Sequence, residues 1–287
     1  MVPKVSTPYG YRRHLFGRIL RDGLTYLVLL FFAIIAIGPI IYLLATSLKK
    51  TYYRIVEMTV FLDPTAQNYQ NLFFNTNYLM WLRNSAIIAG SVTLLVLLLD
   101  SMAGFAFAKK RFQGRDTIFV ILLSTLMVPV AVTLLPTFFI ANRLKLIDTF
   151  AIMIIPALAN PVGVFMMRQF IQTIPDELLE AARIDGCSDL RIFFTMILPL
   201  SVPGLAVLGW FTFMQQWGSY LWPLVVSTTN KTRPINPGLA TFFGQYNTDW
   251  GLAAAGTLVS MVPTLIFFLV VQKYVVEGIT GGRAAKG

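Results

Sequence analysis

Residues 180–203 read EAARIDGCSDLRIFFTMILPLSVP, a polar segment that lies between two long apolar stretches of the chain. Five of its first twelve residues are charged, whereas the whole sequence is 56% hydrophobic and only 13% charged. Soluble domains average about 45–50% apolar and about 25% charged residues. We therefore expect an integral membrane protein, in which this segment lies outside the bilayer and meets a partner there.

Six apolar segments are long enough to cross a bilayer, since a spanning helix needs about 20 mostly apolar residues. The first is too long for the core of a signal peptide and lacks a cleavage site of small residues, so we interpret it as a span. Six spans put both termini on one side. The sequence thus predicts an all-α polytopic membrane protein with an N-terminal tail (1–21), one membrane domain (22–276) and a C-terminal tail (277–287). The predicted spans are residues 24–46, 84–108, 117–141, 150–170, 200–226 and 252–274.

Basic residues set the predicted orientation of these spans. Fifteen of the 23 Lys and Arg residues fall in the two tails, the loop after the second span and the polar segment, and eight fall in the loops on the other side. Cytoplasmic loops of membrane proteins carry the excess of basic residues. Both termini and the polar segment are therefore predicted to be cytoplasmic. For the same reason we interpret the net charge of +10 as a topology signal and not as a surface for nucleic acid.

A short helix is predicted over residues 175–185. Thr173 is a candidate N-cap, Pro175 suits the first turn, and Gly186 can end the helix in the left-handed conformation. A helix of about three turns is too short to be stable alone in water, so we expect it to dock on another surface. A second short helix should follow over residues 188–195, capped by its first or second residue.

This segment resembles the EAA loop of permease subunits from bacterial ABC importers. The matching run is Glu180-Ala181-Ala182, three residues, Gly186, nine residues and then Met196-Ile197-Leu198-Pro199; the family usually has Ile where Met196 stands and often Ala where Cys187 stands. Four other stretches resemble carbohydrate-type permeases, the last of them the tail of the maltose-type MalG subunit. These stretches are residues 105–116, 217–224, 244–251 and 278–287. Five matches in the same order cover nearly the whole chain, which chance explains poorly.

The resemblance implies a transport subunit that is not itself an enzyme. No Gly-Lys pair occurs in the sequence, so it lacks the GxxxxGK[ST] phosphate loop, and ATP and magnesium are expected only on partner ATPase subunits. The implied partners are a second, MalF-like permease, two ATPase subunits and an extracytoplasmic substrate-binding protein, assembled at a bacterial or archaeal inner membrane. In related importers the EAA helix enters a cleft of the ATPase. The residues expected at that contact are Glu180, Ala181, Ala182, Arg183, Asp185 and Gly186.

The path of the cargo is less well marked in the sequence. Sugar sites combine polar groups with aromatic rings, and the fifth predicted span ends in a stretch of this kind, although aromatic residues near a span end also serve as interface anchors. The candidates for the substrate path are Gln215, Gln216, Trp217, Ser219 and Tyr220. By resemblance, the loop over residues 241–251 reaches into the substrate-binding protein. The candidate contacts there are Gln245, Tyr246, Asn247 and Trp250.

Asp100 is an acidic residue within the second predicted span, about 13 Å from its cytoplasmic end. Intramembrane carboxylates are costly and are candidates for function. One reading is a structural carboxylate bonded to Ser or Thr across a helix interface, or in contact with cavity water; the other is a role in coupling. The one cysteine, Cys187, and the one histidine, His14, leave no disulfide pair and no Cys–His nucleophile. We interpret Cys187 as a packed residue and His14 as a solvated one.

The sequence therefore predicts the permease subunit of an ATP-driven importer of a sugar, either an oligosaccharide or a related polyol glycoside. Two alternatives remain open: the same machinery with a cargo such as glycerol phosphate or a polyamine, and an ion-coupled secondary transporter. Two structural alternatives also remain. The helix over residues 175–185 could be an ordinary interfacial helix, and the glycine-rich C-terminal tail, too flexible for a stable helix, could be disordered or could enter the ATPase interface.

Overall fold

The computed structural model describes the backbone of residues 8–49, 64–244 and 248–280, and the side chains of residues 21–49, 64–244 and 248–274. Within these ranges the chain is built of helices, and extended backbone pairs only in one antiparallel bridge between Phe243 and Thr248. The predicted all-α class is confirmed.

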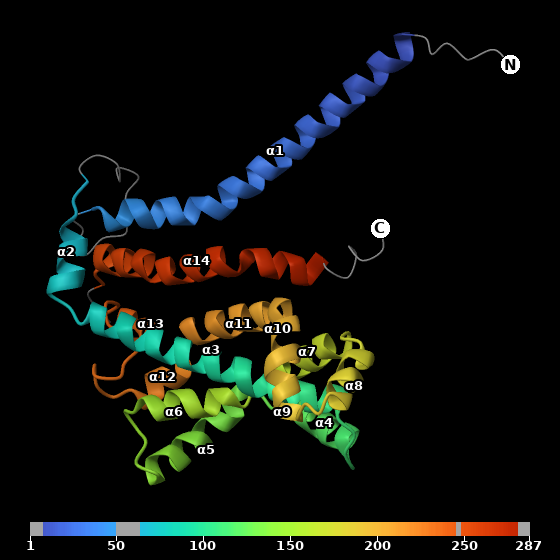
Figure 1. Ribbon diagram of the computed structural model, residues 1–287. Coiled ribbons are helices and arrows are strands. Elements are labelled where there is room, and N and C mark those ends of the chain that lie inside the picture. Colours follow the sequence, from blue (N-terminus) through green and yellow to red (C-terminus); the bar gives the residue numbers. More distant parts are fainter. Residues whose placement is uncertain (1–7, 50–63, 245–247, 281–287) are drawn as a thin grey trace.

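Three helices are each long and apolar enough to cross a membrane: α1 (Pro8–Ser47), α3 (Tyr78–Lys109) and α14 (Trp250–Thr280). They correspond to the first, second and sixth predicted spans. In Figure 1, α14 lies between α1 and the rest of the molecule, and the N-terminal part of α1 extends away from the other helices. No residue in the apolar window of α1 is buried within this chain.

Both tails are more helical than the sequence predicts. Helix α1 begins at Pro8, inside the predicted N-terminal tail, and α14 continues to Thr280 and includes Gly278. The prediction that the C-terminal tail forms no helix is therefore wrong for residues 277–280. One glycine costs about 1 kcal/mol relative to alanine, and a helix that the apolar span has already nucleated can extend past it. Residues 281–287 lie outside the described part of the chain.

The third, fourth and fifth predicted spans are each broken into two helical segments, so the prediction of continuous helices is wrong for them. The chain turns by 97°, 45° and 79° at the three breaks. Pro129, Pro161 and Pro203 lie at these breaks, and proline lacks a backbone N–H and disfavours helical geometry in the residue before it. The pairs are Arg115–Met127 with Val130–Arg143, Phe150–Leu158 with Pro161–Gln172, and Asp189–Leu200 with Val202–Trp217. If each pair crosses as one span, the chain has up to six spans by length and composition.

The fifth predicted span also extends too far. Helix α11 (Val202–Trp217) ends before the predicted end of that span, and after a break at residues 218–220 the chain forms a separate short helix, α12 (Leu221–Val226). The other helices of the bent pairs are α4 (Arg115–Ser124), η1 (Thr125–Met127), α5 (Val130–Arg143), α6 (Phe150–Ile154), η2 (Ile155–Leu158), α7 (Pro161–Gln172), α9 (Asp189–Ile192), the π-helical η3 (Phe193–Ile197) and α10 (Leu198–Leu200). The remaining ones are α2 (Gln67–Phe74), α8 (Asp176–Ile184) and α13 (Ile235–Ala240).

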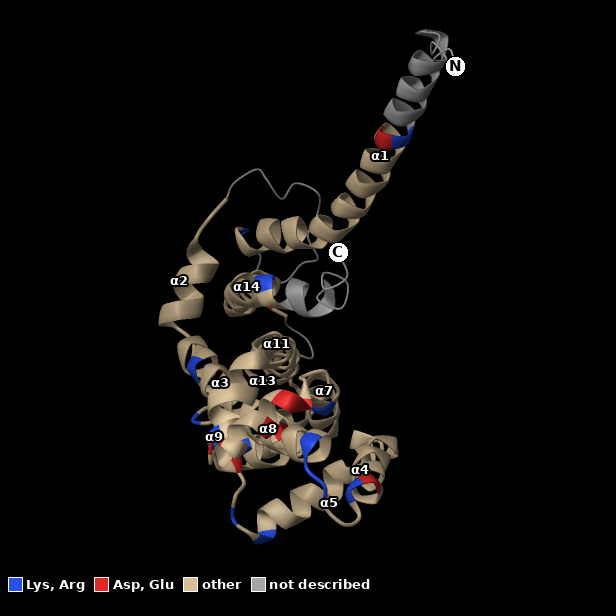
Figure 2. Cartoon of the chain, turned by 45° about the vertical axis from the view of Figure 1, so that its right-hand side comes forward, with Lys and Arg blue, Asp and Glu red and all other residues tan. Residues whose placement is uncertain are grey.

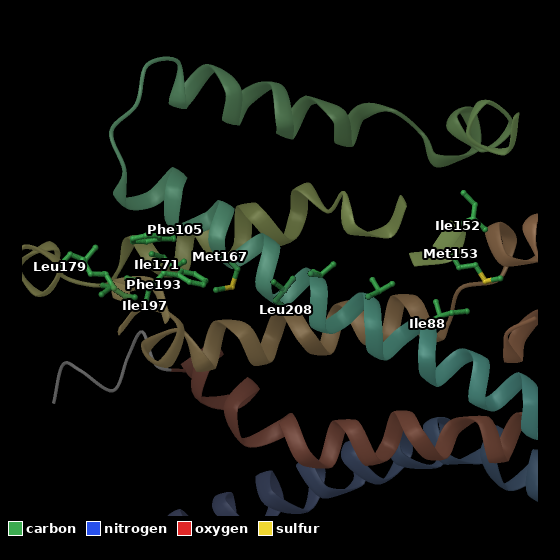
Figure 3. Close-up of a cluster of buried hydrophobic side chains, with 14 of the residues drawn as sticks. Ile88, Phe105, Ile152, Met153, Met167, Ile171, Leu179, Phe193, Ile197 and Leu208 are labelled. Atoms are coloured by element: carbon green, nitrogen blue, oxygen red, sulfur yellow. The ribbon is translucent and has the colours of Figure 1, made fainter. Parts of the chain in front are cut away.

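Helix α3 is the central element of the bundle, with α7 and α11 packed along it. The main hydrophobic cluster follows α3 from Leu179 at one end to Ile88 at the other (Figure 3). Helices α3 and α7 approach closely at Gly104, where an added Cβ would lie 2.7 Å from the Cβ of Met167 and 2.9 Å from the backbone nitrogen of Arg168. Glycine at this position therefore allows the two helices to pack with little space between their backbones.

Candidate functional site

Helix α8 lies where the EAA-like segment was predicted, with different capping at its N-terminus. Pro175 is the N-cap residue and makes no side-chain capping bond, while the Thr173 hydroxyl donates back to the Phe170 carbonyl at the end of α7. The predicted Thr173 cap is therefore wrong, because Thr173 belongs to the turn that ends α7. The acidic residues Asp176 and Glu177 occupy the first turn of α8, where the helix dipole favours negative charge.

The C-terminus of α8 forms the predicted left-handed stop. Gly186 has φ of +78°, and the backbone N–H groups of Gly186 and Cys187 donate to the carbonyls of Arg183 and Ala182. This pair of bonds is a Schellman motif, which favours glycine at its left-handed position. Ser188 caps α9 by accepting a bond from the Arg191 N–H, and the helix continues past the predicted end at residue 195 through η3 and α10.

One side of α8 packs on the protein and the other is open. Leu179 and Ala182 (7% exposed) belong to the main hydrophobic cluster, and Cys187 packs against it. Ala182 is thus not available for a direct contact outside the chain. The exposed side, which we call the α8 face, carries an apolar residue, Ile184, that is 86% exposed. The α8 face consists of Glu180, Ala181, Arg183, Ile184, Asp185 and Gly186.

Ion pairs hold the region of α8 to the end of α3. Lys109 binds Asp176 at the start of α8, and Lys110 binds Asp189 just after it. The hydrogen bond from Lys109 lowers the pKa of the Asp176 carboxyl below its usual value. Figure 2 shows charged residues gathered around α4, α7, α8 and α9 at one end of the molecule.

A cavity of about 1260 Å³ lies between α5, η2, α7, α11 and α12. Three predicted path residues, Gln215, Gln216 and Ser219, line it. Trp217 does not, because it is buried and its indole N–H donates to the Ser260 carbonyl, and Tyr220 lies outside the lining. The polar lining is completed by residues that the sequence analysis did not select, and none of the residues that line this cavity is charged. These additional residues are Ser85, Thr125, Thr133, Thr137, Asn160 and Thr212, with Trp222 as an aromatic neighbour.

Asp100 is 2% exposed and lies at the interface of α3 and α7. Its carboxylate lies beside Gly163 and the Asn160 side chain at the start of α7, and its buried Oδ2 has no hydrogen-bond partner within the described residues. The Asn160 amide oxygen caps α7 by accepting the Gly163 N–H. The expected helix-interface position is confirmed, whereas the expected Ser or Thr partner is wrong, because the residue that faces Asp100 is the N-cap of the broken span. Asn160 lines the cavity, and Asp100 does not.

The outer-loop candidates are placed only in part. Gln245, Tyr246 and Asn247 lie outside the described residues, as does the side chain of His14. Trp250 packs edge-on against Phe243, and both line a separate apolar cavity of about 280 Å³ between α1 and α14.

Comparison with known protein families identifies the family to which this chain belongs. Residues 100–279, which include the broken spans, α8 and α14, match the family described as binding-protein-dependent transport system inner membrane component. The chain belongs to this family. The predicted resemblance is confirmed, and the protein is a multi-pass transport component of the inner membrane.

Curated relatives of this inner membrane component support the same assignment. It is 36% identical to the arabinooligosaccharides transport system permease protein AraQ of Halalkalibacterium halodurans, over 88% of this chain and 92% of the relative. It is 33% identical to AraQ of Bacillus subtilis, over 92% of this chain and 95% of the relative. The sn-glycerol-3-phosphate transport system permease protein UgpE of Shigella flexneri is 35% identical, over 74% and 79% of the two chains.

Two solved structures share the fold of the inner membrane component. A crystal structure of a bacterial ABC transporter involved in the import of the acidic polysaccharide alginate matches with a TM-score of 0.78 at 22% identity, covering 96% of this chain and 100% of that chain. The same kind of transporter in complex with an alginate pentasaccharide-bound periplasmic protein matches with a TM-score of 0.64 at 18% identity, covering 90% and 95%.

Nothing in the sequence indicated a hydrogen-bond network that joins separate loops of the inner membrane component. Asn84 donates to the carbonyls of Asn230, Lys231 and Arg233, and Asp148 accepts bonds from residues of the same loop. Asn84 marked the start of a predicted span and gave no other signal, because a contact across about 150 residues of sequence leaves no periodic pattern. The exposed Ile184 had a signal: it is an apolar residue in a segment predicted to lie outside the bilayer.

Proposed function

We propose that this chain is the permease subunit of an ATP-driven importer of an uncharged oligosaccharide or polyol glycoside, which an external binding protein delivers. The observation that carries the choice of cargo is the large cavity with its uncharged lining. The ATPase subunits supply ATP hydrolysis with magnesium, and a second, MalF-like permease lines the other side of the path. The domain is proposed to cover residues 22–276, with six spans and both termini in the cytoplasm.

The chemistry of the cavity favours a neutral cargo. Hydroxyl and amide side chains such as Thr133, Gln215 and Gln216 can donate to and accept from sugar hydroxyls, and Trp222 offers an apolar surface for a ring. Moving a phosphate or carboxylate into such a cavity would leave its charge without a basic partner from this chain, which is costly. Glycerol phosphate, the cargo in the name of the UgpE relatives, is therefore disfavoured here, although those relatives are about as similar as the AraQ ones.

The coupling function is assigned to the α8 face. The α8 face combines charged residues with an exposed isoleucine on a nine-residue helix, a mixture that suits a contact with a cleft on another protein. Within the face, Glu180 and Arg183 offer charge-assisted hydrogen bonds and Ala181 allows close approach. Ala182 supports the helix from the inside. The hairpin that the Phe243–Thr248 bridge closes is proposed to contact the binding protein.

The ion-coupled alternative receives little support from the position of Asp100. A proton or ion carrier has to meet the transport path, whereas Asp100 is buried between α3 and α7 and does not line the cavity. Asp100 is better explained as a buried polar contact between α3 and the start of α7.

The test of the proposal is uptake by the complete complex in proteoliposomes, with binding protein outside and ATP inside. Labelled neutral oligosaccharides should enter only with ATP, and an excess of glycerol 3-phosphate should not reduce their uptake. Copurification of an ATPase subunit with this chain is the companion measurement. Competition by glycerol 3-phosphate would contradict the neutral cargo, and uptake driven by an ion gradient without ATP would contradict the importer assignment itself.

A further inference from the structure

Lys109, the last residue of α3, is almost buried although it carries a charge: its side chain is 6% exposed. Its ammonium donates to the carbonyl oxygens of Gln172 (3.4 Å) and Ile174 (2.5 Å) and to Oδ1 of Asp176 (2.7 Å). An ammonium has three N–H donors, so all of them are used. One side chain therefore joins the end of α3 to the end of α7 and to the first turn of α8.

The position of this ammonium suits both helix ends that it touches. The last carbonyls of a helix carry partial negative charge, and the first turn of a helix favours an acidic side chain. Lys109 lies at the C-terminus of α7, and Asp176 lies at the N-terminus of α8. The contact thus joins α8 to two other helices through a buried ammonium, although the Asp176 carboxylate itself is largely exposed.

The other basic residues near α8 do not make an equivalent contact. Lys110 pairs with Asp189, after α8 has ended, and Arg183 approaches that same carboxylate at 4.0 Å from a largely exposed position. Arg111 is exposed. Among the ion pairs within the described residues, Lys109 with Asp176 is the one that joins α3 directly to α8.

Helix α3 is suited to carry a displacement from this contact across the membrane. It has 32 residues without a proline, which corresponds to about 48 Å of helix. Near its other end, Ser85 and Ile88 line the cavity. Helix α7, by contrast, is separated from the rest of its span by the break before Pro161. A movement of α8 therefore reaches the cavity wall along α3 through a continuous helix.

We propose that Lys109 is a positioning residue that transmits displacement of α8 to α3 and so to the wall of the transport cavity. This inference rests on the proposed function, because it takes α8 as the contact with the ATPase. Without the Lys109 ammonium, α8 can move on its ATPase while α3 stays in place, and ATP is hydrolysed without transport.

The experiment measures cargo uptake and ATP hydrolysis together in proteoliposomes that hold the complete complex. Lys109→Met should lower the uptake per ATP about tenfold, the size expected for one lost charge-assisted hydrogen bond, while hydrolysis continues. The matched control is Arg111→Met, which removes the same charge from the next exposed position and should stay within about twofold of wild type.

The outcomes separate this inference from the proposed function. If Lys109→Met does not assemble, Asp176→Lys takes its place, because Asp176 is largely exposed, and it too must lower the uptake per ATP. A wild-type ratio in Lys109→Met or Asp176→Lys would overturn the inference. The absence of ATP-dependent uptake in the wild-type complex would instead overturn the proposed function.

Discussion

At the scale of single residues, Asp100, Asn160 and Gly163 form one unit across the interface of α3 and α7. A Cβ added to Gly163 would overlap the Asp100 carboxylate and would lie 2.6 Å from the Asn160 amide nitrogen. The glycine is thus needed for the space that the carboxylate occupies, since its φ is not in the left-handed region. Gly163, in the fourth predicted span, therefore leaves the space that Asp100, in the second predicted span, occupies.

This unit makes a prediction about stability. Gly163→Ala should destabilise the solubilised protein by about 1–3 kcal/mol, the usual cost of overpacking, and Asp100→Ala in the same chain should recover most of that loss. Thermal unfolding of the purified complex is the measurement. Asp100→Asn, which keeps a polar group beside Asn160, should retain most of the uptake; a near-total loss of uptake in an assembled Asp100→Asn complex would contradict the structural role.

Asp148 gives a prediction of pH dependence for the loop contacts that it makes with Thr229 and Thr232. Its partial burial raises the pKa, but hydrogen bonds from Thr229 and Thr232 outweigh this effect, so the pKa of Asp148 is lowered. A carboxyl with a lowered folded pKa contributes stability above its unfolded pKa, about 3.9, and loses it as the pH falls through the folded value. The wild-type outer loops should therefore loosen below about pH 4, measured by protease cleavage near Thr229.

The control for that prediction is Asp148→Asn, which cannot ionise. It should be cleaved faster than wild type at neutral pH and should show a smaller increase on acidification. Equal cleavage of the two proteins at pH 7 would mean that Asp148 does not hold the loops together.

At the scale of elements, the sequence predicted the three continuous long helices and the ends of α8 better than it predicted the bent spans. Length and apolar content are local properties, and Gly186 signals a stop through its own backbone preference. The breaks at Pro129 and Pro161 depend on how much neighbouring helices stabilise a kinked span, which hydropathy does not measure. The cavity could be predicted only as a set of polar residues, because its walls come from several helical segments that are far apart in the sequence.

The prediction at this scale concerns Gly186, the residue that ends helix α8. Gly186→Val should cost about 1–2 kcal/mol, since a β-branched residue resists the left-handed conformation, and no atom lies close enough for a clash to add to the cost. A nine-residue helix cannot absorb that strain, so uptake should fall while the amount of protein in the membrane stays normal. Gly186→Asn is the matched control, because asparagine tolerates this conformation, and it should retain most of the uptake. Equal uptake in both variants would show that the stop is not required.

At the scale of the whole molecule, the cavity and the α8 face lie at different places along α3, and in the proposed importer this chain forms one wall of the path. Such a division fits a machine in which a partner supplies the work and another supplies the opposite wall. The charge of the cavity lining is then a property by which this chain can select its cargo without a partner.

That property can be tested by adding a charge to the cavity. Gln215→Arg places a cation in the uncharged lining, and because a charge without a partner resists desolvation, the uptake of a neutral oligosaccharide should fall at least about tenfold. Gln215→Asn, which keeps the amide, should retain most of the uptake. The control is Gln169→Arg, the same exchange at an exposed position of α7 that does not line the cavity, and it should leave uptake unchanged. Binding-protein-stimulated ATP hydrolysis should persist in all three, because none of them touches the α8 face. Unchanged uptake in Gln215→Arg would show that the cargo does not pass along this wall, and the transport path would then have to be assigned to the companion permease.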